Sequence, residues 1–178
     1  MADGSRRQAR ERALSLLYEA ESKDLAPTAV LNQLPVEPDP YTIEILRGVS
    51  LHAAELDALI TEFARDWTID RMPALDRALL RMAIFELAHL PDVPTGVVIS
   101  EAVDLAGRFS TDESSRFVNG MLSRIAEAVR PPKGRGASRA VPVLEAEPVD
   151  AEVVGAGPAI DNQAAAGQVV EDGLHQQG

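Results

Sequence analysis

The 178-residue sequence contains no cysteine, and aromatic residues make up only 4% of it. The first absence excludes disulfides, thiolate metal sites and a thiol nucleophile, and it fits a reducing compartment. The second favours helices over strands. No apolar run approaches the roughly 18 residues of a membrane span, and the arginine-rich beginning does not lead into a signal-peptide core. We therefore expect a soluble cytoplasmic protein with no membrane partner.

Positive charge is also scarce, because the formal net charge is −11. This balance argues against a surface that coats nucleic acid generally, so any nucleic-acid contact must be a local patch. The apolar fraction of 46% is sufficient for the core of one domain of ordinary size.

A change of composition near Pro131 divides the chain. Residues 1–132 carry a helical rhythm of apolar residues throughout. Residues 133–178 are rich in proline, glycine, alanine and acidic residues and show no apolar period. We expect a helical domain over 1–132 and a disordered tail over 133–178.

Apolar spacing and proline positions predict an all-α fold of six or seven helices. The first helix is expected from Ser5, as its N-cap, to about Glu21. The remaining helices are expected at Thr28–Leu34, in a stretch from Pro40 that Gly48 and Ser50 divide in two, and at Pro73–Leu90, Thr95–Phe109 and Glu113–Val129.

The first predicted helix opens with arginines that oppose the helix macrodipole, so stability alone does not explain them. A helical projection places Arg7, Leu14 and Tyr18 on one flank, with Arg10 at its border. The apolar core row contains Ala9, Ala13, Leu16, Leu17 and Ala20. Two interpretations stay open: a solvated face beside a contact with a neighbouring helix, or an RNA or anion site that continues into a protein-binding patch.

Two later helices carry polar residues at informative positions. Glu86 projects among apolar residues, so we expect it to be buried or half-buried and to need a partner, either an arginine or capped backbone amides. Gly120 lies in a helix interior, where glycine destabilises the helix by about 1 kcal/mol relative to alanine. Such a glycine indicates that another group approaches the backbone closely. Its neighbours Asn119, Arg116 and Phe117 offer a hydrogen-bonding amide, a cation and a stacking ring.

Four motifs, RRQARERALSLLYE, LDRALLRMAIFEL, VPTGVVISEAVDLAGRF and FVNGML, occur in this order and closely resemble the NusB family of bacterial transcription antitermination factors. The resemblance spans roughly residues 5–130. It implies two small helical bundles, no catalysis and no cofactor. It also implies binding to the boxA element of nascent RNA, notably from ribosomal RNA operons, together with the ribosomal small-subunit protein NusE. Other Nus factors and RNA polymerase are implied as indirect partners.

Carried over residue by residue, the resemblance assigns two sets of surface residues. The RNA-binding set comprises Arg6, Arg7, Arg10, Glu113, Arg116 and Phe117. The set facing the ribosomal protein comprises Tyr18, Asp70 and Asp76, with Leu14 beside Tyr18 on the projected helix. Ser100 and Ser123 depart from the Asn and Asp that the family often has, which puts local hydrogen bonds in doubt, and the tail matches nothing in the family.

Other function classes are weaker. The module also resembles the N-terminal part of ribosomal-RNA cytosine methyltransferases, but the chain has no catalytic domain after residue 130 and no cysteine. His52, His89 and His175 are far apart in sequence and form no HExxH pair, so we expect no metal site. The serious alternative is a helical interaction or dimerisation module without RNA binding, and a homodimer stays open.

Overall fold

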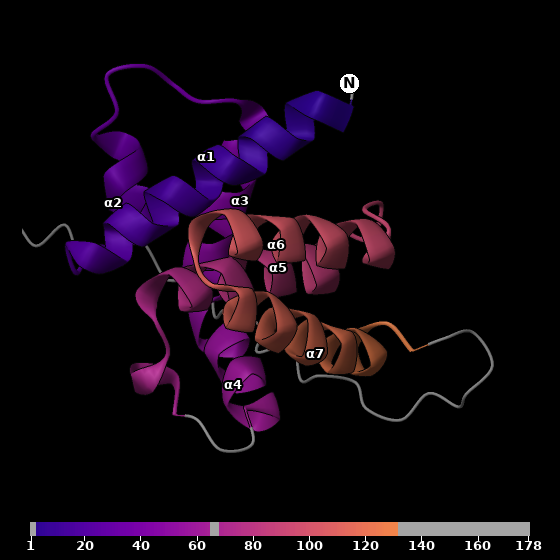
Figure 1. Ribbon diagram of the computed structural model, residues 1–178. Coiled ribbons are helices and arrows are strands. Elements are labelled where there is room, and N and C mark those ends of the chain that lie inside the picture. The colour runs from indigo at the N-terminus through magenta and orange to yellow at the C-terminus, as the bar shows by residue number, and fades with distance from the viewer. Residues whose placement is uncertain (1–2, 65–67, 132–178) are drawn as a thin grey trace, which may run out of the picture. The chain divides into compact units, whose positions relative to one another are not determined.

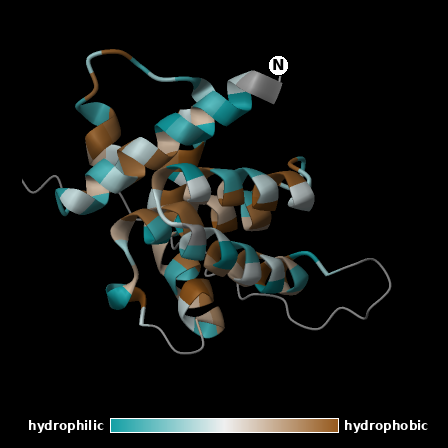
Figure 2. Ribbon diagram, viewed as in Figure 1, coloured by the Kyte–Doolittle hydropathy of each residue, from teal (hydrophilic) through white to brown (hydrophobic). Residues whose placement is uncertain are grey.

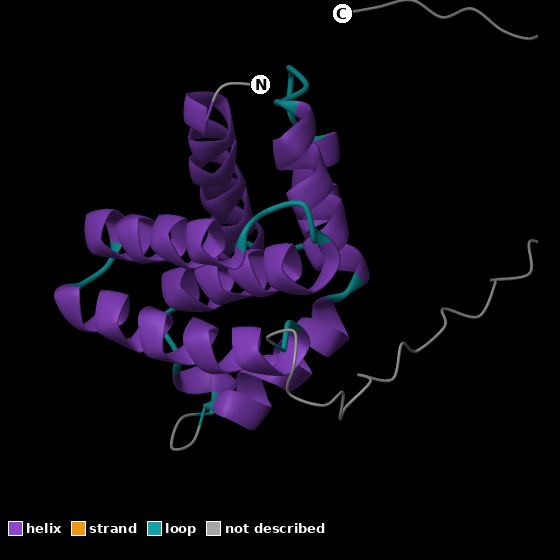
Figure 3. Cartoon of the chain, turned by 90° about the vertical axis from the view of Figure 1, so that its right-hand side faces the viewer, coloured by secondary structure: helices purple, strands orange, loops and turns teal. Residues whose placement is uncertain are grey.

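The computed structural model describes residues 3–64 and 68–131 (Figure 1). These ranges contain no strand, as Figure 3 shows, which confirms the all-α prediction. The helices are α1 (Asp3–Ser22), α2 (Pro27–Asn32), α3 (Pro40–Leu51), α4 (Ala53–Phe63), the 3-10 turn η1 (Ile69–Arg71), α5 (Ala74–His89), α6 (Thr95–Phe109) and α7 (Asp112–Val129). The predicted disordered tail, 133–178, lies outside the described residues.

Helix α5 is the centre of this arrangement. It contacts α1 and α3 of one group, which also includes α2, and α4, α6 and α7 of the other. The run from Leu79 to Leu87 is buried at every position but Arg81, as expected for a helix that packs on several sides. Figure 2 shows α5 as largely hydrophobic behind α6, whereas the front of α7 is largely hydrophilic. The core row predicted for α1 is also buried.

Helix boundaries follow prolines and capping side chains. Pro27 and Pro40 begin α2 and α3, and Pro73 and Pro94 are the N-caps of α5 and α6. The α7 N-cap is Thr111, whose Oγ1 accepts a hydrogen bond from the Ser114 amide at 3.1 Å.

The prediction for the first N-cap was wrong. Helix α1 already begins at Asp3, so Ser5 lies within its first turns. Ser5 precedes the apolar row and has the right side chain for a cap, but the helix continues upstream of it. The other predicted starts agree with the structure to within two residues.

The structure gives Gly48 and Gly120 roles that differ from those predicted. The break in the stretch from Pro40 falls at His52, and Gly48 lies inside α3, where a Cβ would collide with the ring of Phe85. Gly120 is exposed, and a Cβ built there meets nothing within 4 Å. The predicted close approach at Gly120 was therefore wrong, and such an approach occurs at Gly48 instead. Asn119, beside Gly120, is also exposed.

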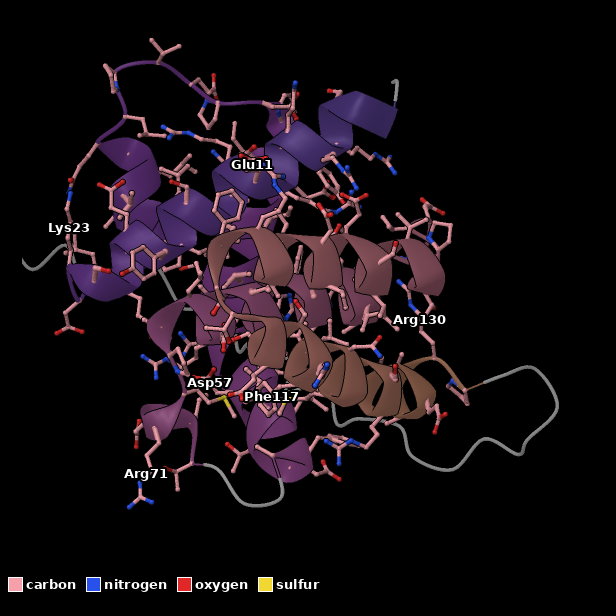
Figure 4. The ribbon with its side chains drawn as sticks, in the orientation of Figure 1. Glu11, Lys23, Asp57, Arg71, Phe117 and Arg130 are labelled. Carbon is pink, nitrogen blue, oxygen red and sulfur yellow. The ribbon has the colours of Figure 1, made fainter. Side chains whose placement is uncertain are left out.

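The carboxyl end of α5 is closed by Arg130, which follows α7 and is labelled in Figure 4. Its guanidinium donates to the carbonyl oxygens of Glu86, Leu87, Leu90 and Val93 at 2.6–2.8 Å. These carbonyls lie at the helix end and just beyond it, where the intrahelical donors run out. The end of α7 is therefore fastened to the end of α5.

Candidate RNA-binding and protein-binding surfaces

Arg10, the third arginine assigned to RNA, is buried rather than exposed. Arg10 is 1% exposed, and its Nε donates a hydrogen bond to Glu86 Oε1 at 2.9 Å. Tyr41 also donates its hydroxyl to Glu86. The prediction that Arg10 contacts RNA phosphates is incompatible with this geometry, whereas the prediction that Glu86 is buried with an ionic partner is confirmed.

The electrostatics of this buried cluster agree with a formed ion pair. Burial alone would lower the pKa of Arg10, but the hydrogen bond and charge of Glu86 outweigh it, so the pKa is raised. Burial and the Glu86 charge together raise the pKa of Tyr41, which keeps its hydroxyl a donor. The sequence held a signal for this placement, because Arg10 is three residues before Ala13 and seven before Leu17 on the buried row.

Arg6 and Arg7 are exposed at the beginning of α1. Arg7 forms an ion pair with Glu101 of α6 at 3.0 Å, and its Nη2 lies 3.8 Å from Asp104. The guanidinium of Arg6 lies over the Tyr41 ring, 5.2 Å from its centroid. This basic turn is therefore accessible, but the charge of Arg7 is shared with acidic side chains of α6.

A second exposed group lies at the start of α7. Glu113 and Arg116 are exposed, and Phe117 is partly buried against the hydrophobic core. In Figure 4, Phe117 lies well away from the first turns of α1. The structure therefore separates the predicted RNA-binding residues into an α1 group, Arg6 and Arg7, and an α7 group, Glu113, Arg116 and Phe117.

Asp76 does not face outward as expected for a partner contact. It is 3% exposed, and its Oδ2 accepts a hydrogen bond from Ser114 Oγ at 2.8 Å. Ser114 in turn lies within hydrogen-bonding distance of Ser110 and Thr111, at 2.9 and 3.0 Å. Asp76 therefore fixes the turn between α6 and α7, and its position near the amino end of α5 suits a carboxylate.

An open groove lies beside this turn, between α1, the start of α5 and the end of α6. Its volume is about 610 Å³, and its lining is mostly apolar. Tyr18 and Phe109 are each 45% exposed there, whereas Leu14 is buried at 2% and forms part of the floor. The remaining lining residues are Glu11, Ser15, Pro73, Ala74, Leu75 and Ser110. We call this feature the Tyr18 groove.

The Tyr18 groove corrects one prediction and adds one residue. Leu14 was expected off the core, yet its side chain is covered and can meet a partner only through the groove. Phe109 was not singled out as a site residue. It continues the α6 row of Val98, Ala102 and Leu105 one turn beyond the buried part, and an aromatic residue in that place is the signal that could have found it.

Asp70 is exposed in η1 and lines a different hollow. There Arg77 pairs with Glu21, and Arg81 pairs with Asp57 at 2.7 Å. The three residues expected to face the ribosomal protein thus occupy three situations: Tyr18 in the groove, Asp70 in the neighbouring hollow and Asp76 in the core. Among the described helices, none is long and apolar enough to cross a membrane.

Comparisons with known proteins agree with this fold. The NusB family model matches residues 7–127. Transcription antitermination protein NusB of Kineococcus radiotolerans is 46% identical over 127 residues, which cover 69% of this chain and 93% of that protein. T. maritima NusB superposes with a TM-score of 0.65 and 30% identity, covering 71% of this chain and 93% of that chain.

A structure of the antitermination factors NusB and NusE in complex with double-stranded RNA is also similar. Its matching chain gives a TM-score of 0.61 at 25% identity and covers 71% of this chain and 99% of that chain. The family match and the identity over most of the relative's length agree with the four sequence motifs and the helical fold. The chain belongs to the NusB family.

Proposed function

We propose that this chain is a non-enzymatic antitermination factor that binds boxA-type RNA of nascent transcripts, notably from ribosomal RNA operons, together with the ribosomal protein NusE. The observation that carries the proposal is the Tyr18 groove, an open apolar groove with two exposed aromatic side chains next to a basic turn. The related NusB structure that contains both NusE and RNA supports the choice of ligands.

The Tyr18 groove is the proposed NusE-binding surface. Aromatic side chains that become covered on binding are frequent anchors of protein interfaces, and Tyr18 and Phe109 are both half-exposed. Glu11 lies on the lining, and the whole chain carries a net charge of −11. An acidic surface favours association with a basic ribosomal protein.

The α1 group is the proposed phosphate-binding part of the RNA site. A phosphate that reaches Arg7 must compete with Glu101 and Asp104, so the net gain from this contact is smaller than for an unpaired arginine. In the α7 group, Arg116 and Phe117 provide a cation and a ring edge for a single-stranded base. We therefore expect modest, salt-sensitive RNA binding by the chain alone.

The two surfaces meet at α1 and α6, so ligands bound to them would lie side by side and could be coupled through direct contact. Glu11, one helical turn after Arg7 on α1, lines the Tyr18 groove and forms an ion pair with Arg108 of α6 at 3.0 Å. Bound NusE would thus lie beside the RNA rather than over it. Linkage requires that each ligand tighten the other by the same factor, typically 1–3 kcal/mol of coupling.

The alternative is an interaction or dimerisation module without RNA binding. The same groove favours it, because exposed aromatic side chains can bury themselves against a second copy. Sedimentation of the free chain over a range of concentrations distinguishes a self-interface from a monomer with a vacant partner surface.

The test measures the affinity for labelled boxA-type RNA with and without saturating NusE, for the wild type and Tyr18→Asp. We expect NusE to tighten RNA binding about 5- to 150-fold in the wild type. Tyr18→Asp should remove this gain and leave the RNA affinity of the chain alone nearly unchanged. The matched control is Val36→Asp, which places the same charge on a residue that is 77% exposed and outside the groove.

Each contrary outcome has a distinct meaning. Absence of saturable RNA binding with and without NusE would contradict the RNA proposal and leave the interaction module. Competition between NusE and RNA would contradict the adjoining arrangement. Loss of the NusE effect in Val36→Asp as well would show that the added charge, and not the groove, is responsible.

A further inference from the structure

Two histidines that are far apart in the sequence lie against each other in the fold. His52 is the junction residue between α3 and α4, and His89 is the last residue of α5. Their rings stack with centroids 3.8 Å apart and an interplanar angle of 27°. Glu55, in the first turn of α4, lies beside both: its Oε2 is 3.1 Å from His52 Nδ1 and 3.3 Å from His89 Nε2.

The donor atoms are arranged as a ligand set rather than as a complete hydrogen-bond network. His89 Nε2 is buried and is not satisfied by a regular hydrogen bond, although Glu55 Oε2 lies 3.3 Å from it. A buried nitrogen of this kind lacks a partner that a cation would supply.

The spacing suits a tetrahedral metal ion. Two ligands each about 2.1 Å from zinc are separated by about 3.4 Å at the tetrahedral angle. The two distances from Glu55 Oε2, 3.1 and 3.3 Å, are close to this separation, and all three donor atoms lie within 4.8 Å of one another. The stacked rings must change their tilt to converge on one point, and their side chains are 29% and 27% exposed.

We propose that His52, Glu55 and His89 form a binding site for a divalent transition-metal ion of the zinc type. Two imidazoles and one carboxylate are a known zinc donor set that leaves the fourth position for water. The bound ion would join the α3–α4 junction to the carboxyl end of α5. Because imidazole donors favour zinc, nickel and copper over magnesium or calcium, the site should discriminate against the latter ions.

This site is separate from the Tyr18 groove. The Tyr18 groove includes Leu75 at the amino end of α5, and His89 lies fourteen positions further along the helix, about 21 Å at 1.5 Å per residue. Metal binding and NusE binding at the groove can therefore fail independently. The sequence prediction of no metal site rested on the wide spacing of the histidines, which the fold removes for His52 and His89.

The experiment titrates Zn²⁺ into the full chain, prepared without a polyhistidine tag and treated with a chelator, in a calorimeter. We expect one saturable site per chain. His89→Ala and Glu55→Gln should each weaken Zn²⁺ binding at least about tenfold, since losing a direct ligand should matter at least as much as losing an outer-shell partner. The matched control is His175→Ala, which removes the third histidine of the chain and should bind as the wild type does.

Thermal unfolding with and without Zn²⁺ separates loss of ligand from loss of fold. Zn²⁺ should raise the Tm of the wild type and of His175→Ala, and leave that of Glu55→Gln nearly unchanged, whatever its metal-free Tm. Co²⁺ should give the visible absorption of a tetrahedral site in the wild type and in His175→Ala, and not in His89→Ala or Glu55→Gln. Absence of saturable Zn²⁺ binding, or equal binding by the wild type and His89→Ala, would overturn the proposal. Loss of binding in His175→Ala would do so as well.

Discussion

The beginning of α1 and the Tyr18 groove, whose α1 residues lie about one to three turns further along, present opposite kinds of surface. At the beginning, Arg7 is paired with Glu101, and Arg10 is enclosed with Glu86. In the groove, Tyr18 and Phe109 expose nearly half of their surface to solvent. A ligand gains by covering apolar area in the groove, but at the arginines it must exchange one ionic partner for another. The comparison therefore predicts that a partner in the groove binds mainly through apolar contact, whereas RNA at the arginines binds more weakly and depends on salt.

The largest expected effect is a loss of stability, and it tests the contrast between the buried Arg10 and the exposed Arg7. Arg10→Ala leaves the Glu86 carboxylate buried without its cation, so the free energy of unfolding should fall by about 3–5 kcal/mol. Urea denaturation measures this change. Arg7→Ala removes a pair whose arginine is 49% exposed, and the loss should stay below about 1 kcal/mol.

The double variant Arg10→Met/Glu86→Leu sharpens the same contrast. It removes both buried charges, so it should be more stable than Arg10→Ala even though Tyr41 loses its acceptor. Equal losses for Arg7→Ala and Arg10→Ala would mean that Arg10 is solvated in solution and would return it to the candidate RNA-binding residues.

The next effect concerns the Tyr18 groove. Phe109→Ala removes one of its two exposed rings and should weaken NusE binding by about tenfold, because truncating an anchor at an interface commonly changes the binding free energy by more than 1 kcal/mol. Calorimetry or anisotropy with NusE measures it. Leu51→Ala, at a residue that is 74% exposed and outside the groove, is the control, and a similar loss there would contradict the assignment.

The smallest effect is expected at the α1 group. Arg6→Ala/Arg7→Ala should reduce the slope of log K against log salt for single-stranded RNA by about 0.7 per phosphate contact, about 1.4 for two. Arg71→Ala/Arg124→Ala removes the same charge from η1 and α7 and should leave the slope unchanged. An unchanged slope in the first variant would exclude direct phosphate contacts by Arg6 and Arg7.

The helices were predictable because their signals are local. Proline positions and apolar spacing gave the starts of α5, α6 and α7 to within two residues. The projection of α1 also predicted its buried row, but it could not predict how deeply the residues at the margin of that row are buried. Arg10 and Leu14 lie at the margin of that row, yet both are buried, Arg10 against Glu86 of α5 and Tyr41 of α3. Whether a residue at the margin of the row is exposed depends on where the neighbouring helix packs. The sequence of one helix alone does not contain that information.

For residues that pair across distant elements, the sequence predicted at most the type of partner and not which residue it is. The sequence indicated that Glu86 needs a partner, either an arginine or capped backbone amides, but Arg10 could not be identified as that partner across 76 residues. Asp76 looked like an exposed acid until the α6–α7 turn supplied Ser114. The stacking of His52 on His89 had no local signal, because it depends on where α3 ends against α5.

The contact between Gly48 and Phe85 couples two positions that are 37 residues apart in the chain. The ring occupies the space that any Cβ at position 48 would need, so no other residue fits there while position 85 keeps its full size. A larger residue at 48 is admissible only together with a smaller one at 85, such as Phe85→Leu. That exchange also removes the ring that stacks on His89 at 5.4 Å. Sequence change at one glycine of α3 thus reaches the end of α5 through a single aromatic side chain.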